Sequence, residues 1–341
     1  MGSVKDLKII KPVAERESGI GQFYFSDRYS VFDWGEMPDL IKDKGKSLCI
    51  LGAFFFEKLE QLGINTHYQG LVENGTVKHL AELKQPSGVM QVSLVRVLKP
   101  ETDKTAYDYS LYQSRPVNCL IPLEIIYRNS LPAGSSVFKR LQNGSLSLAD
   151  LGLQQMPEPN SVLAAPVLDC STKLEATDRY LSWSEAAKIS GLSREELDKL
   201  QSTTRLINDL ISKQTKAVGL FNEDGKVEFA FDPNRNLMLV DVLGTPDECR
   251  FTASGIPVSK EVARIYYRKS SWFKDLEAAK AKDRVNWKKH VASQPPKLPK
   301  RLFELIGHLY QSTCNEITQR RWFAVPALPT ILQYIREQIE E

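Results

Sequence analysis

The sequence lacks any apolar run that approaches about 18 residues, the length a membrane-spanning helix needs. Its N-terminus also lacks the pattern of a secretory signal peptide. The net charge is only +3, from 45 basic and 42 acidic residues, and the basic residues are dispersed among the acidic ones without a nucleic-acid-binding motif. We therefore expect a cytoplasmic protein whose partners include no membrane and no nucleic acid.

Cysteine and histidine are scarce and scattered, with five and four residues respectively. No two cysteines form a Cys-x-x-Cys pair, so the sequence predicts neither a disulfide framework nor a zinc site. The histidines are isolated as well, and no Ser/His/Asp or Cys/His catalytic group can be argued from the sequence. Reduced, mostly buried thiols are the simpler interpretation of the cysteines.

The rest of the composition is ordinary for a soluble globular protein, with 42% hydrophobic and 26% charged residues. A length of 341 residues is long for one domain and suits a two-lobed protein. The chain contains no internal repeat and no low-complexity tract. Apolar patterns of both strand and helix periodicity occur along it, which predicts mixed strands and helices.

The most informative stretch runs from Asp224 to Arg250 and predicts a β-hairpin that carries charge on one face. If residues 233–236 form a four-residue loop, Glu228 lies directly opposite Asp241. Lys226 then shares the face of these two carboxylates. The opposite face is apolar and is expected to consist of Val227, Phe229, Phe231, Met238, Val240 and Val242.

Two carboxylates on neighbouring strands in this register would lie about 5 Å apart at Cβ. They repel each other unless a cation lies between them, and their hard oxygen atoms suit a Mg²⁺ ion that also holds phosphates. The lysine on the same face would add a phosphate contact. The alternative is an ordinary amphipathic hairpin whose charged face is solvated.

Two further groups of polar residues follow predicted strands. Arg128 ends a strand and is followed by the turn Gly134-Ser135, which together could grip a phosphate, since guanidinium pairs bidentately and a glycine turn exposes backbone N–H groups. The alternative is a turn and a surface arginine. Asp27 and Arg28 follow an aromatic strand, where they either meet a ligand or form a local ion pair.

Several blocks of the sequence, in the same order from residue 2 to about 317, resemble the SAICAR synthetase family, the phosphoribosylaminoimidazole-succinocarboxamide synthases. The hairpin reads Asp-Gly-Lys-Val-Glu-Phe-Ala, then an Asp, then Thr-Pro-Asp-Glu-Cys-Arg. The family has Asp-x-Lys-x-Glu-Phe-Gly, then Asp-Glu-Val-x-Thr-Pro-Asp-x-x-Arg. Ala230 therefore replaces a glycine and Val242 a glutamate, while Ser3 replaces the first of two basic residues near the N-terminus.

The resemblance implies a ligase that joins L-aspartate to the carboxylate of carboxyaminoimidazole ribonucleotide (CAIR), with ATP becoming ADP and phosphate. It implies an acyl phosphate intermediate and ATP and Mg²⁺ as cofactors, and it allows a homo-oligomer. The implied fold is α+β, two-lobed and related to ATP-grasp proteins, with antiparallel sheets. The expected division is an ATP-binding lobe over residues 1–117, a larger lobe over 118–318 and an extension over 319–341.

The resemblance also implies a role for each matching site residue. For Mg²⁺ these residues are Glu228 and Asp241, and for ATP they are Lys5, Glu124 and Glu228. For CAIR they are Arg128, Ser135, Asp224 and Arg250, and for aspartate they are Lys173 and Asp178. Lys226 and Arg250 are the expected catalytic residues.

Two alternatives from other classes remain at this stage. A phosphotransferase on a related fold could use the same Mg²⁺ face to transfer phosphate to a hydroxyl group. Alternatively, Ser3 and Val242 could mark a noncatalytic relative that binds nucleotide without turnover. The intact Lys226, Glu228 and Asp241 argue against this second alternative.

Overall fold

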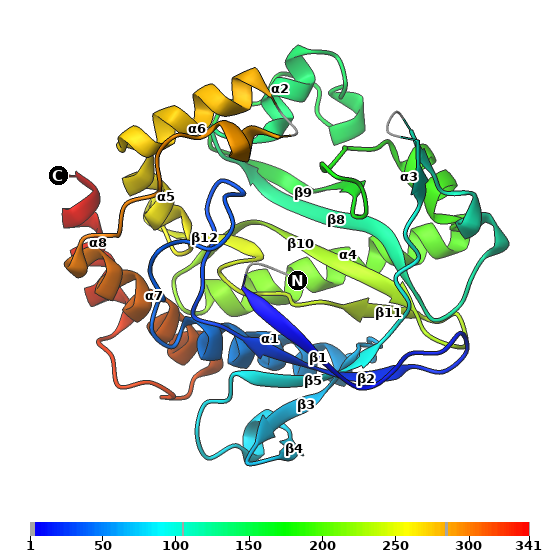
Figure 1. Cartoon of the computed structure of the whole chain (residues 1–341), viewed down its shortest axis with the longest axis horizontal. Helices are drawn as coiled ribbons and strands as arrows, with labels where there is room; N and C mark the ends of the chain where they lie inside the picture. The colour runs from blue at the N-terminus through cyan, green and yellow to red at the C-terminus, as the bar shows by residue number, and fades with distance from the viewer. Residues whose placement is uncertain (1–3, 104–105, 284–285, 341) are drawn as a thin grey trace.

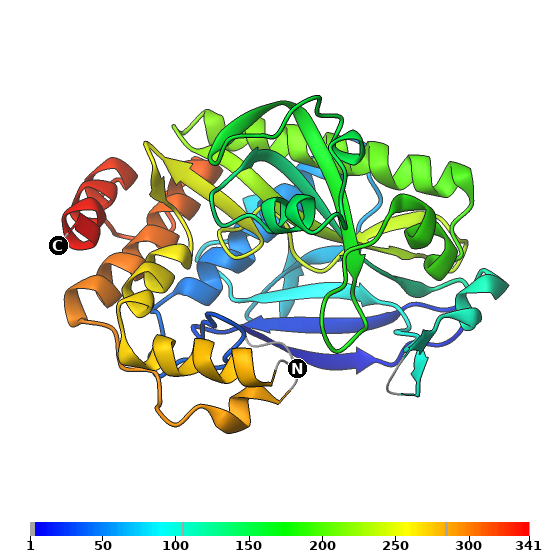
Figure 2. The ribbon, with the colours of Figure 1, turned by 90° about the horizontal axis from the view of Figure 1, so that it is seen from above.

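The computed structural model describes residues 4–103, 106–283 and 286–340. Two antiparallel sheets form its frame, and Figure 1 shows the first sheet below the second, with helices α5–α8 gathered at one end of the molecule. Figure 2 shows the same helices at that end from a perpendicular direction. The mixture of helices and antiparallel sheets confirms the predicted α+β class.

The first sheet has the strand order β1-β2-β5-β3-β4, and all its pairs are antiparallel. Its strands are β1 (Lys5–Lys11), β2 (Gly19–Phe25), β3 (Tyr68–Glu73), β4 (Thr76–Lys78) and β5 (Val89–Leu94). Helix α1 (Lys44–Gln61) covers this sheet, against which it buries Leu48, Leu51, Phe55 and Leu59, apolar residues that recur at helical spacing. The helix ends before Gly63, which has the positive φ of 77° that glycine tolerates best.

The second sheet has the order β13-β12-β10-β8-β9, and β11 pairs with β10. Its strands are β8 (Cys119–Leu131), β9 (Ser161–Thr172), β10 (Phe221–Phe231), β11 (Leu237–Val240), β12 (Cys249–Ala253) and β13 (Ile256–Pro257). A small ribbon of β6 (Glu101–Thr102) and β7 (Tyr107–Asp108) stands apart from both sheets. The first sheet thus uses strands up to Leu94 and the second begins at Cys119, while the division into lobes at residue 117 stays a prediction.

The other helices are α2 (Ser136–Gln142), α3 (Trp183–Ser190), α4 (Arg194–Lys216), α5 (Glu261–Arg268), α6 (Ser271–Lys282), α7 (Lys300–Thr318) and α8 (Leu328–Glu340). Short 3₁₀ helices lie at Leu80–Glu82, Ser110–Ser114, Ala149–Leu151 and Trp287–His290. The sequence Ser193-Arg194-Glu195-Glu196 has the spacing of a capping box, and this box forms at the start of α4: the Ser193 hydroxyl accepts from the Glu196 N–H, and the Glu196 carboxylate accepts from the Ser193 N–H. Helix α4 lies along one face of the second sheet, which leaves the other face for the site (Figure 2).

The hairpin of β10 and β11 forms, but its predicted register is wrong by one residue. The loop spans five residues, because the Asp232 N–H donates to the Asn236 carbonyl and Phe231 pairs with Leu237. Glu228 therefore pairs with Val240, while Asp241 follows the end of β11. The Asp232 carboxylate also accepts from the N–H groups of residues 234 and 236, an interaction that favours the longer loop.

The shifted register also corrects the predicted faces of the hairpin. Val227, Phe229 and Phe231 lie in the main core with Leu239, as an alternating strand requires. Met238 and Val240 lie instead on the Glu228 side, in a separate apolar cluster with Leu120 and Ala230. The face that carries Glu228 is therefore partly apolar.

Two segments form a strand and a helix that the sequence analysis does not predict. Residues 166–172 belong to β9, an edge strand where Pro166 costs no ladder hydrogen bond. The C-terminal extension forms α8, which buries Leu328, Ile331 and Ile335 in the main core beside α5 and α7.

Among the helices of the described residues, none combines the length and the apolarity that crossing a bilayer requires.

Candidate active site between the two sheets

The face of the second sheet opposite α4 carries a cluster of two carboxylates and two lysines. Glu124 on β8 pairs directly with Glu228 on β10. The Lys173 ammonium lies 2.8 Å from Glu124 and 2.7 Å from Glu228, and the Lys226 ammonium lies 2.9 Å from Glu124. Four predicted site residues thus form one alternating network, in which each carboxylate is screened by a lysine.

Asp241 joins this network to the first sheet. Its φ of 64° is left-handed, which turns the chain sharply after β11. The buried His67 ring donates from Nε2 to the Asp241 carbonyl over 2.9 Å, and Lys5 on β1 forms an ion pair with the Asp241 carboxylate. The structure therefore brings Lys5, Asp241 and Glu228 to the junction of the two sheets, although not through the predicted strand pairing.

The two carboxylates at this junction differ in their proton affinity. Burial and the neighbouring Asp241 charge raise the pKa of Glu228. Burial would also raise the pKa of Asp241, but Lys5, Lys173 and Lys226 outweigh it and hold that pKa below its usual range. Burial opposes the charge of both lysines, yet Glu228 and Glu124 keep the pKa of Lys173 above its usual value, and Glu248, Glu124 and Glu228 do the same for Lys226. A further cation near Glu228 would relieve the repulsion that raises its pKa.

The arginine cavity lies next to this network, at the other end of the same sheet face. It has a volume of about 260 Å³ and is lined by Ile126, Arg128, Tyr180, Asp224, Gly225, Lys226, Pro246, Asp247, Glu248, Cys249, Arg250, Ser259, Lys260 and Arg264. Asp224 pairs with Arg128 on one neighbouring strand and with Arg250 on the other. Its carboxylate lies 3.5 Å from Arg128 and 2.8 Å from Nε of Arg250.

Arg128 has a second carboxylate partner besides Asp224 that the sequence did not suggest. Asp169 on β9, which sequence reasoning missed, lies 3.2 Å from Arg128. It also forms an ion pair with Arg140 on α2, the helix in the connection between β8 and β9. No local motif marks Asp169, because its partners come from β8 and α2. Ser135, predicted to grip the phosphate, caps α2 by accepting from the Val137 N–H.

Asp178 lies apart from the ion-pair network. It is exposed on the segment after β9 and lines a separate cavity of about 1240 Å³. Asp33, Lys280 and Lys288 line the same cavity, so both signs of charge surround it. Partial enclosure by the cavity walls and the Glu124 charge raise the pKa of Asp178.

Asp27 and Arg28, two sequence candidates for ligand contact, take structural partners. The Asp27 carboxylate accepts from the N–H groups of Asp43 and Gly45 at 3.1 and 3.0 Å, and so caps the start of α1. Arg28 pairs with Asp6. Ser3 lies outside the described residues.

An apolar surface adjoins the Lys5 and Asp241 pair. Leu7 and Ile9 lie on the same face of β1 as Lys5, yet they are 48% and 61% exposed. On the second sheet, Ala230, Met238 and Val240 form an apolar cluster on the Glu228 side of the hairpin. Exposed apolar side chains beside an ion pair suit a ligand that has a flat apolar part and a charged part.

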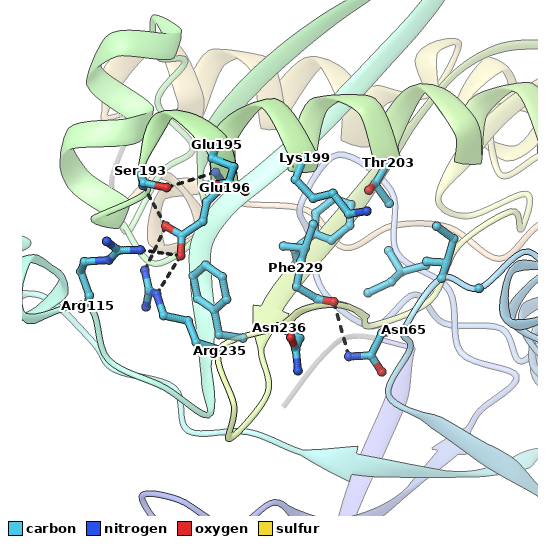
Figure 3. Close-up of a pocket in the computed structure, with 15 residues that line it drawn as sticks. Asn65, Arg115, Ser193, Glu195, Glu196, Lys199, Thr203, Phe229, Arg235 and Asn236 are labelled. Atoms are coloured by element: carbon cyan, nitrogen blue, oxygen red, sulfur yellow. Dashed lines mark hydrogen bonds and ion pairs between the residues drawn. The ribbon is translucent and has the colours of Figure 1, made fainter.

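The back of the hairpin faces a different pocket, of about 600 Å³, which Figure 3 shows. Phe229, which lines it, points away from the charged network. Glu196 at the start of α4 takes both Arg115 and Arg235 as ion-pair partners at the pocket edge. Of the predicted site residues, none lines this pocket, so we do not place the chemistry there.

His67 makes stability depend on pH. Burial lowers its pKa to about 4 from 6.5, despite the hydrogen bond to Asp241. As the pH falls, the imidazole of His67 therefore binds a proton in the unfolded chain before it does so in the folded one. The free energy of unfolding contributed by neutral His67 is complete above pH 6.5 and is lost as the pH falls towards 4, by up to about 3 kcal/mol. Urea unfolding across this window should show the loss. In His67→Gln the pH dependence should be shallower, and an equal slope would contradict the assignment.

Taken together, carboxylates and lysines lie at the junction of the two sheets and arginines on the adjoining face of the second sheet, an arrangement found in proteins that bind and align anionic substrates. Residues 13–279 match the family model of SAICAR synthetase. This match covers well over half of the chain, and so the chain belongs to the SAICAR synthetase family.

Relatives of the chain carry the corresponding name. An Archaeoglobus fulgidus protein, provisionally named phosphoribosylaminoimidazole-succinocarboxamide synthase, is 48% identical over 340 residues and covers 100% of both chains. The synthase of Thermoplasma acidophilum is 32% identical over 308 residues, which cover 88% of this chain and 93% of that one.

Solved structures agree in fold. The Saccharomyces cerevisiae SAICAR synthase, in complex with SAICAR, has a TM-score of 0.64 at 20% identity over 95% of each chain. A SAICAR synthetase in complex with ADP has a TM-score of 0.56 at 21% identity and covers 87% of this chain and 99% of that one. These likenesses support the predicted SAICAR synthase-like fold.

Proposed function

We propose that this chain is an ATP-dependent ligase of purine biosynthesis that joins L-aspartate to the carboxylate of CAIR and releases SAICAR, ADP and phosphate. A carboxylate is a poor electrophile, because attack places more charge on an anionic group. In the first step a CAIR carboxylate oxygen bonds to the γ-phosphorus of ATP and the bond to ADP breaks. In the second step the aspartate amine attacks the acyl carbon, phosphate leaves with the bonding electrons, and the amine loses a proton.

Glu228 and Asp241 would hold Mg²⁺ together with the ATP phosphates. Their oxygen atoms fit a hard cation, and the raised pKa of Glu228 marks a place where positive charge is favourable. Among the described residues no group of three or more His, Cys, Asp and Glu side chains gathers as a ready-made metal site, so phosphate oxygens would complete the ligand set. When bound, Mg²⁺ would screen the charge of the phosphates.

The nucleotide would lie between the two sheets. Lys5, which forms an ion pair with Asp241, would contact its phosphates, and Glu124 would contact the nucleotide from β8. The base would pack on the apolar side chains of Leu7 and Ile9, which are exposed beside Lys5. Lys226 would screen the charge that develops on the transferred phosphoryl group and on the acceptor carboxylate.

The arginine cavity would bind the ribonucleotide. Arg128 and Arg250 present guanidinium groups suited to a phosphate, with Ser135 as a further contact carried over from the family. Asp224 would accept hydrogen bonds from the ribose or imidazole. Lys173 and Asp178 would orient aspartate, the lysine through the substrate carboxylates. A homo-oligomer and a cytosolic location stay predictions.

The observation that carries this proposal is the junction where Lys5 on β1 meets Asp241, with Glu228 and the arginine cavity on the adjoining sheet face. This arrangement would accommodate a nucleoside triphosphate next to a phosphorylated acceptor. The purified chain should form ADP and SAICAR only when Mg-ATP, CAIR and aspartate are all present, as followed by product absorbance and an ADP assay.

The same assay separates the alternatives. Rapid ADP formation that does not depend on aspartate would point to a phosphotransferase and contradict the ligase. Binding of ADP and CAIR without product would identify a noncatalytic relative. A mixture that lacks only CAIR is the matched control for background ATP hydrolysis.

A further inference from the structure

A buried ion pair connects the start of α1 to the turn beside the arginine cavity. The Lys44 ammonium lies 2.6 Å from Asp247 Oδ2, and the two side chains are 0% and 5% exposed. Tyr310 on α7 donates its hydroxyl hydrogen to Asp247 Oδ1 over 2.7 Å. Both carboxylate oxygens of Asp247 are thus engaged by residues from helices that are distant in sequence.

Burying two charges is costly, and an apolar pair of similar volume would often give equal or greater stability. Burial lowers the pKa of Lys44, although the attraction of Asp247 opposes this shift. A gain in the free energy of unfolding therefore does not account for this network. Its position in the molecule points to a different role.

Lys44 is the first residue of α1, next to the first sheet. The residues around it, Asp43 and Gly45, donate their N–H groups to Asp27, directly after β2. Gly45 also approaches the backbone of Phe25 so closely that a Cβ there would lie 2.5 Å from the Phe25 carbonyl oxygen. The start of α1 is therefore fixed to the end of a strand in the first sheet.

Asp247, at the other end of the ion pair, lies next to the candidate active site. It lies in the turn between β11 and β12 and lines the arginine cavity together with Glu248 and Arg250. Glu248 approaches Lys226 to 3.6 Å, and its carbonyl accepts from the Lys226 N–H. A displacement of this turn would move residues of both the arginine cavity and the charged network.

We propose that Lys44, Asp247 and Tyr310 form a tether that sets the position of the arginine cavity relative to the first sheet, and that they act as positioning residues for phosphoryl transfer. This inference rests on the proposed function, in which ATP lies against the first sheet and CAIR lies in the cavity. Transfer requires the γ-phosphorus and the acceptor oxygen to be aligned, and a misplacement of about 1 Å can cost about 10²-fold in rate.

The tether predicts a loss of kcat with little change in either KM. Tyr310→Phe removes one hydrogen bond and should lower kcat by about threefold to tenfold, while Lys44→Met/Asp247→Asn removes both charges and should lower kcat by about 10²-fold. The KM values for ATP and CAIR should stay within about threefold, since Lys44 does not line the arginine cavity and Asp247 is replaced there by an amide of the same shape. Thermal melting, measured alongside, should show both variants folded at the assay temperature.

Lys78→Met is the matched control, because it breaks an ion pair with Glu73 that lies within the first sheet. Glu73 keeps the N–H groups of Lys84 and Gln85 as partners, so no carboxylate is left unpaired. The kcat of this variant should stay close to that of the wild type.

Each outcome decides the matter. A folded double variant with wild-type kcat would overturn the tether, and so would a loss confined to the KM of one substrate. If the double variant does not fold, Tyr310→Phe decides by the same measurements. A wild type that forms no product from the three substrates would instead overturn the proposed function, and the tether with it.

Discussion

Replacement of Glu228 by Gln, or of Asp241 by Asn, is expected to lower kcat by about 10³-fold, because each change removes one charged oxygen ligand of the nucleotide-bound cation. Neither change should unfold the protein. Lys173 keeps Glu124 as a partner when Glu228 is neutral, and Lys5 is partly exposed and lies 4.8 Å from the Phe23 ring centroid. Initial rates at saturating substrates, measured over a range of Mg²⁺ concentrations, test this expectation.

Glu223→Gln provides the control for these two variants. Glu223 lies on the same strand as Glu228 and accepts a hydrogen bond from Thr252. The same chemical change there should leave turnover near the wild-type value. Retention of more than about a tenth of wild-type kcat in both Glu228→Gln and Asp241→Asn would exclude the carboxylates as cation ligands.

The sequence predicts which residues belong to the candidate site better than it predicts how they are arranged in space. Alternation places Lys226 and Glu228 on one face of β10 and Phe229 in the core, and the structure has them so. The register depended on the length of the hairpin loop, which the Asp232 side chain extends to five residues. One residue more in the loop moved Asp241 out of the strand.

Long-range partners explain what the sequence could not provide. Lys5 reaches Asp241 across 236 positions, and His67 reaches the carbonyl of the same residue across 174. No local pattern encodes such contacts, because they depend on how the first sheet is placed against the hairpin. Helix boundaries, in contrast, follow local capping chemistry, and the capping box of Ser193 and Glu196 was therefore predictable.

Arg250→Met is expected to raise the KM for CAIR and to lower kcat/KM for CAIR by about 10²- to 10³-fold, the loss of two charge-assisted hydrogen bonds to a phosphate. Binding of ADP should be unchanged, because Arg250 lies in the arginine cavity and not beside Lys5. Titration calorimetry with ADP and kinetics with varied CAIR would measure the two effects separately.

The structure makes this substitution a clean test of binding. Asp224 keeps Arg128 as a partner at 3.5 Å, so Arg250→Met leaves no buried carboxylate unpaired. Arg268→Met is the control, since Arg268 pairs with Glu261 on α5 outside the cavity lining. A fall in kcat without a rise in the KM for CAIR would contradict a phosphate contact. It would show instead that Arg250 acts in the transition state, because an interaction made only there changes kcat and leaves ground-state binding intact.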